Sequence, residues 1–240
     1  MVLIYPFISI QAQSEKSEVI IISTIHSAHK INPNYSYDSL FAFIEKFDPE
    51  VIGIEIRKED IDSSQDYLKR NYPYEMYECI SKYSSKEVVG LDWLGEDIKG
   101  KAIPENYWNE ESQIKGLQQK LSADSVMLKR LTVTNVIQEE KVKIALSASL
   151  YELNDGRYDL INQIYYEQLE LLLKDTPYED LTDFYQKRDE KIATNILEVI
   201  NNNEGKKMIF LVGADHRCFT LKKVREAFND TILLNQLLLK

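Results

Sequence analysis

The sequence lacks the glycine motifs of the commonest nucleotide and serine-hydrolase sites. It has eight glycines in 240 residues, and none of them forms GxGxxG, GxxxxGK[ST] or GxSxG. Those patterns bring backbone against phosphate, or expose a nucleophilic serine on a tight turn. Their absence argues against dinucleotide-dependent enzymes, P-loop NTPases and standard serine hydrolases.

Cysteines and basic clusters are also scarce. Cys79 and Cys218 lie far apart and no CxxC occurs, which excludes a zinc knuckle and indicates no disulfide framework. The net charge is −10 without any Lys/Arg-rich block, which argues against nucleic acid or anionic membrane as a partner. No apolar run after the first dozen residues approaches membrane-spanning length. We expect no integral membrane segment and a small-molecule or peptide partner, and the sequence gives no oligomeric state.

The hydrophobic fraction of 44% and the charged fraction of 28% are ordinary for a globular protein, so we expect a single domain over 1–240. Residues 1–13 allow two interpretations. They are apolar like the end of a secretory signal, but the basic region that begins such signals is missing, since the first lysine is Lys16. They are either the remnant of an export signal or an extra edge strand of a cytoplasmic protein.

Four apolar runs predict buried parallel strands. These are Glu18–Ile25, Val51–Arg57, Val88–Asp92 and Met208–Val212, with a final apolar run over Thr231–Leu239. Helical spacing predicts a helix from about Asp38 that ends at Asp48-Pro49, a charged helix over 58–70, one opened by Pro73 and one over about 220–228. Gly53 and Gly90 interrupt two strands, which indicates close approach of a ligand or backbone, or helix-to-sheet packing.

Between about 95 and 205 the character changes to long helical patterns with few breaks. The order is βαβαβ, then a helical block, then βαβ, which predicts an α/β fold with a mostly parallel sheet flanked by helices. The sheet core covers about 17–94 and 206–240, with a helical insertion over about 95–205 between its third and fourth strands.

Polar residues stand where the predicted strands end. Because parallel strands share a carboxyl edge, we expect this set to meet there: His26, Glu55, Arg57, Asp92 and His216. Arg188 opens the helical stretch that returns to the last core strand, and it can project toward the same edge. His29 follows His26 by three residues, but a HxxH in a loop fixes no geometry for a metal.

This set of residues has three interpretations. His26, Glu55 and His216 match a catalytic metal set of two histidines and a carboxylate with an open position for water. A neutral histidine beside a carboxylate can equally act as a base without metal. The third interpretation is a polar network that only holds strand ends together. Arg57 and Arg188 could bind a substrate carboxylate or an oxyanion, or form surface ion pairs.

The chain resembles the TraB/PrgY/GumN superfamily, whose relatives include Tiki-type proteases, erythromycin esterases and ChaN-like haem-binding proteins. The resemblance rests on four stretches and on their order: Ser23–His26, Asp48–Glu55, Arg188–Ala193 and Val212–His216. It implies an α/β core with a helical insertion and a site of His26, Glu55, Arg188 and His216. In these relatives the site is that of a metal-dependent protease, of a metal-free esterase or of a haem-binding protein.

We therefore expect a hydrolase in which His26 or His216 activates water, directly or on a divalent transition metal, with Arg188 on the substrate or oxyanion. The alternatives are a protein that binds haem or another small ligand without turnover, and an interaction module that has lost its chemistry. Ser23 stands where the family usually has glycine, which favours the last alternative.

Overall fold

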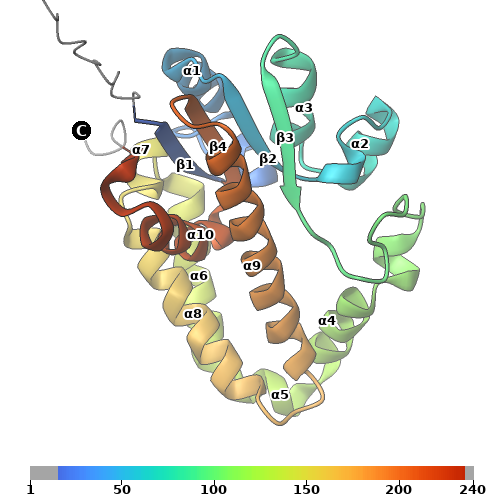
Figure 1. Cartoon of the computed structure of the whole chain (residues 1–240). Helices are drawn as coiled ribbons and strands as arrows, with labels where there is room; N and C mark the ends of the chain where they lie inside the picture. The colour runs from blue at the N-terminus through green and yellow to red at the C-terminus, as the bar shows by residue number, and fades with distance from the viewer. Residues whose placement is uncertain (1–15, 236–240) are drawn as a thin grey trace, which may run out of the picture.

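A five-stranded parallel sheet forms the centre of the molecule (Figure 1). The structure is a computed structural model that describes residues 16–235. The strand order is β3-β2-β4-β1-β5, and every neighbouring pair is parallel. The α/β fold with a parallel sheet is therefore confirmed. The strands are β1 (Glu18–Thr24), β2 (Val51–Arg57), β3 (Glu87–Asp92), β4 (Lys207–Gly213) and β5 (Leu233–Leu234).

Helices connect and cover these strands. Before β3 they are η1 (His26–Lys30), α1 (Tyr37–Phe47), η2 (Lys58–Asp60), α2 (Gln65–Asn71) and α3 (Tyr74–Lys82). Between β3 and β4 come η3 (Tyr107–Glu111), α4 (Gln113–Ala123), α5 (Ser125–Arg130), α6 (Thr132–Ser147), α7 (Leu150–Leu153), α8 (Arg157–Leu173) and α9 (Glu179–Asn202). After β4 come α10 (Ala214–Phe228) and η4 (Asn229–Thr231).

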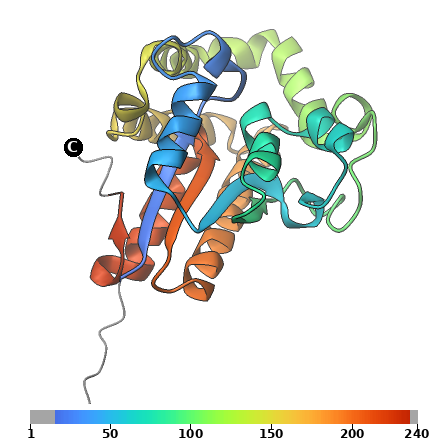
Figure 2. The same ribbon diagram turned by 90° about the horizontal axis from the view of Figure 1, so that it is seen from above.

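Alternate residues of each central strand face opposite layers of helices, as the two-residue period of a strand requires. In β1, Ile20 and Ile22 pack with residues of α1 and α3, whereas Val19 and Ile21 pack with residues of α9 and α10. Figure 2 shows the helices on both sides of the sheet. A sheet buried on both faces explains why its strands are continuously apolar in sequence.

Most of the helical block between β3 and β4 lies beyond the carboxyl edge of the sheet, toward which the arrow of β3 points in Figure 1. Part of this block has an apolar cluster of its own, formed by residues of α5, α8 and α9 with Leu131 and Tyr178. The 24-residue helix α9 runs from this block back along the sheet. Residues of the block are thereby placed over the strand ends. Among residues 16–235, no helix is long and apolar enough to cross a membrane.

Several predicted boundaries differ from the structure. The charged stretch 58–70 is divided into η2 and α2, separated by a turn. The helix expected from about residue 220 begins at Ala214, directly after β4, so His216 lies in its first turn. The last apolar run contributes only the two residues of β5 among those described. The alternatives for 1–13 concern residues outside the described range.

Gly53 and Gly90 do not approach a ligand site. A Cβ at Gly53 would lie 2.4 Å from Cδ1 of Phe210 on the neighbouring strand, and one at Gly90 would lie 2.6 Å from the carbonyl oxygen of Ile56. The second contact falls where the pairing of β2 with β3 shifts register. Both glycines therefore serve packing within the sheet.

Candidate active site

A cavity of about 320 Å³ lies at the carboxyl edge of the sheet and contains most of the predicted site. The ends of β1, β2 and β4 form its floor, and α6, α8, α9 and the start of α10 close around it. Its polar lining includes His26, Glu55, Arg188, Asp215 and His216. The structure thus brings together the four residues that the family resemblance implies.

His26 is held by a buried carboxylate that the sequence analysis did not identify. Its Nδ1–H donates to Oε1 of Glu75 on α3 at 2.8 Å, and the Glu75 side chain is 0% exposed whereas that of His26 is 41% exposed. Burial lowers the pKa of His26, but the hydrogen bond to Glu75 and the charge of Glu55 outweigh it, and the net shift is upward. The backbone of His26 has φ 50°, the left-handed region that costs free energy and often occurs at functional sites.

His216 has an equivalent partner on α9. Its Nδ1–H donates to Oδ1 of Asp189 at 2.5 Å. Burial lowers the pKa of His216, but Glu55 and Asp189 reverse the effect, so that its pKa is raised. A carboxylate on Nδ1 fixes the tautomer and leaves Nε2 as the reactive nitrogen. Both site histidines are thus oriented in the same way from separate elements.

Glu55 lies between the two histidines. Its Oε1 is 3.6 Å from Nε2 of His216 and accepts a hydrogen bond of 2.6 Å from Nη2 of Arg188. Burial alone raises the pKa of a carboxyl group, but His216, Arg188 and His26 lower that of Glu55 to about 2. Asp92 holds the other edge of the guanidinium, through Nε at 2.8 Å and Nη2 at 2.9 Å. Arg188 is thereby fixed between two carboxylates.

Gly213 is required where β4 enters α10. Its N–H donates to Oε2 of Glu55 at 2.5 Å. A Cβ at this position would lie 2.9 Å from Nε2 of His26 and 3.2 Å from Oε2 of Glu55. Its φ of −53° is open to any residue, so space rather than backbone conformation demands glycine here.

A buried lysine connects the helical block to this cavity. Lys141 on α6 has a side chain that is 1% exposed, and its Nζ lies 3.0 Å from Oδ1 of Asp215. Tyr158 also donates to this oxygen at 2.7 Å, and the ring centroid of Tyr165 lies 4.3 Å from the ammonium. Burial lowers the pKa of Lys141. This network fixes the side chain of Asp215, the residue that directly precedes His216 in the chain.

His29 and Arg57 are engaged elsewhere. Nδ1–H of His29 donates to the carbonyl of Tyr35 at 2.7 Å, and its Nε2 accepts from the N–H of Ile25 at 3.1 Å. Arg57 is buried and donates to Asp60 and to the carbonyls of Ile98 and Lys101. His29 therefore orders the turn after β1, and Arg57 ties β2 to the loop after β3. The structure brings neither of these two predicted secondary residues into the cavity.

The sequence offered unequal signals for the residues that it missed. Asp189 and Asp215 each adjoin a predicted site residue, so their proximity was visible although their roles were not. Glu75 stands in a short helix after Pro73 with no motif around it. Its role depends on the packing of α3 beside η1, which a local pattern does not encode.

The predicted metal set does not fit this arrangement. Oε1 of Glu55 lies 2.6 Å from a guanidinium, and Oε2 accepts the N–H of Gly213. A metal on the same carboxylate would be repelled by Arg188. Among the described residues, no group of three or more His, Cys, Asp or Glu side chains is placed to hold a metal ion. Metal and haem binding stay predictions.

No protein-family model, curated protein or solved structure matches the chain.

Proposed function

We propose that the protein is a hydrolase that activates water with a carboxylate-backed histidine, without a metal. The observation that carries this proposal is the pair of imidazoles, each held at Nδ1 by its own carboxylate, lining one cavity with Glu55 between them. Hydrolysis of an ester or amide needs a base for water and an acid for the leaving group. Two histidines oriented in this way supply both.

His26 is the better base, because its side chain is 41% exposed and water reaches it from the cavity. His216 is more enclosed, with a side chain 9% exposed, and the ionised Glu55 favours its protonated form. His216 is therefore suited to give a proton to the leaving group. Neither role is open to His29, whose ring nitrogens are both occupied by backbone groups.

Arg188 is suited to hold the carbonyl oxygen of the substrate. Its Nε and Nη2 bind Asp92 and Glu55. Among residues 16–235, these hydrogen bonds leave Nη1 for a ligand or water. A fixed donor aimed at a developing oxyanion stabilises the transition state more than the ground state.

The proposal is tested with a panel of p-nitrophenyl esters and fluorogenic peptides. His26→Asn and His216→Asn should each lower the rate at least about 100-fold with little change in melting temperature. His29→Asn is the matched control, and it should lower the melting temperature because it removes two hydrogen bonds to the backbone. No cleavage of any substrate, or equal loss of stability in all three variants, would contradict the proposal.

Whether the activity depends on a bound metal is tested by a separate measurement. Elemental analysis of the purified protein by plasma mass spectrometry should find no stoichiometric transition metal, and a chelator should leave the rate unchanged. A metal at one equivalent that is lost in His26→Asn would overturn the metal-free mechanism and restore the metalloenzyme. A Soret shift on adding hemin, abolished in the same variant, would favour the haem-binding alternative.

A further inference from the structure

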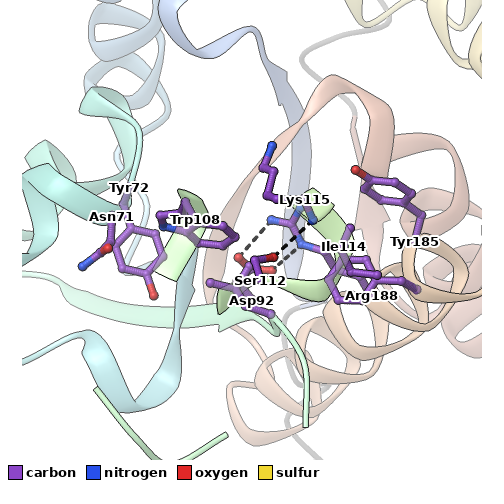
Figure 3. Close-up of a pocket in the computed structure, with 11 residues that line it drawn as sticks. Asn71, Tyr72, Asp92, Trp108, Ser112, Ile114, Lys115, Tyr185 and Arg188 are labelled. Carbon is purple, nitrogen blue, oxygen red and sulfur yellow. Dashed lines mark hydrogen bonds and ion pairs between the residues drawn. The ribbon is translucent and has the colours of Figure 1, made fainter. Parts of the chain in front are cut away.

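A second, smaller cavity adjoins the candidate active site at Arg188. Its volume is about 160 Å³, and it shares Arg188 and Tyr185 with the first cavity. Figure 3 shows the Asp92–Arg188 pair at its centre, with Trp108 on one side and Tyr185 on the other. We call it the aromatic recess. Its lining is Asn71, Tyr72, Asp92, Leu94, Trp108, Ser112, Ile114, Lys115, Phe184, Tyr185 and Arg188.

We propose that the aromatic recess binds one uncharged six-membered ring of the substrate, next to the bond that is cleaved. This inference rests on the proposed hydrolase function, because the ring belongs to a substrate only if the protein cleaves the bond beside it. The size of the recess supports a single ring, since an apolar cavity of about 150 Å³ is known to hold benzene. The recess is lined by the aromatic side chains of Tyr72, Trp108, Phe184 and Tyr185, and aromatic side chains favour contact with a further ring.

Arg188 points to the chemistry beside the ring. Among residues 16–235, the hydrogen bonds of its guanidinium to Asp92 and Glu55 use Nε and Nη2, so Nη1 can donate to a ligand. A carbonyl oxygen attached to the ring would accept this hydrogen bond. Aryl amides and aryl esters carry such an oxygen.

The charges at this position favour a neutral ring over an anionic one. Arg188 pairs with both Asp92 and Glu55, so these two carboxylates compensate its positive charge before a ligand enters. Lys115 is the other cation of the lining, but it is exposed and therefore screened by water and salt. A carboxylate on the ring would gain little from Lys115 and would lie close to the carboxylate of Asp92, which lines the recess.

Calorimetric titration of the full chain with benzamide, acetamide and benzoate tests this inference without turnover. Benzamide should bind at least about tenfold more tightly than acetamide, which lacks the ring, and than benzoate, which adds a charge. Ile114→Trp should fill the recess and abolish benzamide binding, whereas Gln113→Trp, at the exposed neighbouring position, should retain it. If Ile114→Trp does not fold, Trp108→Ala replaces it as the test, and this variant should weaken benzamide binding about tenfold.

Benzamide binding no tighter than acetamide, or unchanged in both recess variants, would overturn the proposal, and tighter binding of benzoate would overturn its charge assignment. Failure of the hydrolase proposal gives a different result from failure of the recess proposal. If only the hydrolase proposal fails, no ester is cleaved, but benzamide still binds and Ile114→Trp still abolishes benzamide binding. Cleavage of esters by a protein that does not bind benzamide would contradict the recess alone.

Discussion

At the residue scale, the site depends on carboxylates that set the protonation of their neighbours. Glu75 is the clearest case, because it is fully buried and one of its oxygens, Oε2, has no partner among the described residues. A buried carboxylate with a single partner is costly to keep unless it serves the group that it touches. Here that group is the imidazole of His26.

Glu75→Gln is therefore expected to lower the pKa of His26, since it removes the hydrogen bond and the charge that raise it. A base with a raised pKa is active only at higher pH, so the acid limb of the pH–rate profile should move to lower pH in the variant. The maximal rate should fall at least about tenfold, because the imidazole is less basic and less well oriented. Glu78→Gln on the same helix is the matched control and should leave the profile unchanged.

At the element scale, the junction of β4 with α10 shows what a sequence pattern can and cannot reveal. The apolar run ending at Gly213 predicted a buried strand and placed His216 at the sheet edge, and both are observed. The pattern did not reveal that the helix begins at once, because the polar residues after Gly213 are compatible with a loop. Glu55 and Asp92 were accessible to sequence reasoning because they stand at the ends of apolar strands. Arg188 was expected to open its helix but lies in the middle of α9, which begins at Glu179.

Gly213→Ala should reduce activity at least about 100-fold, because its methyl group would displace the His26 ring and misalignment of about 1 Å has effects of this size. The melting temperature should change little, since the backbone conformation suits alanine. Gly116→Ala in α4 is the matched control, with nothing within 4 Å of the added methyl. It should leave the rate unchanged and slightly raise stability. Full activity in Gly213→Ala would show that the His26 position is not critical.

At the scale of the whole molecule, Glu55 couples the site to acid stability. Its folded-state pKa is about 2 against an ordinary value of 4.5, so its stabilising contribution is present above pH 4.5 and is lost as the pH falls through about 2. The difference corresponds to about 3 kcal/mol at neutral pH.

Glu55→Gln should consequently be less stable than the wild type at pH 7, with a gap that narrows between pH 4.5 and 2. Urea unfolding at a series of pH values measures this gap. The exposed Glu204→Gln is the matched control and should show no pH-dependent difference. A gap that stayed constant down to pH 2 would mean that the carboxylate is not held ionised by His216, Arg188 and His26.

The most direct test of the account is a pH titration of the three histidines by NMR, with each resonance assigned through single variants. Two of them, His26 and His216, should titrate above 6.5, and His29 should titrate below it. Glu75→Gln should lower the pKa of His26, and that of His29 through the lost charge, but should not lower that of His216. Asp189→Asn should lower the pKa of His216, with Asp183→Asn as the control on the same helix. Site histidines that titrate near 6.5 and respond to neither substitution would contradict the paired arrangement on which the proposed chemistry rests.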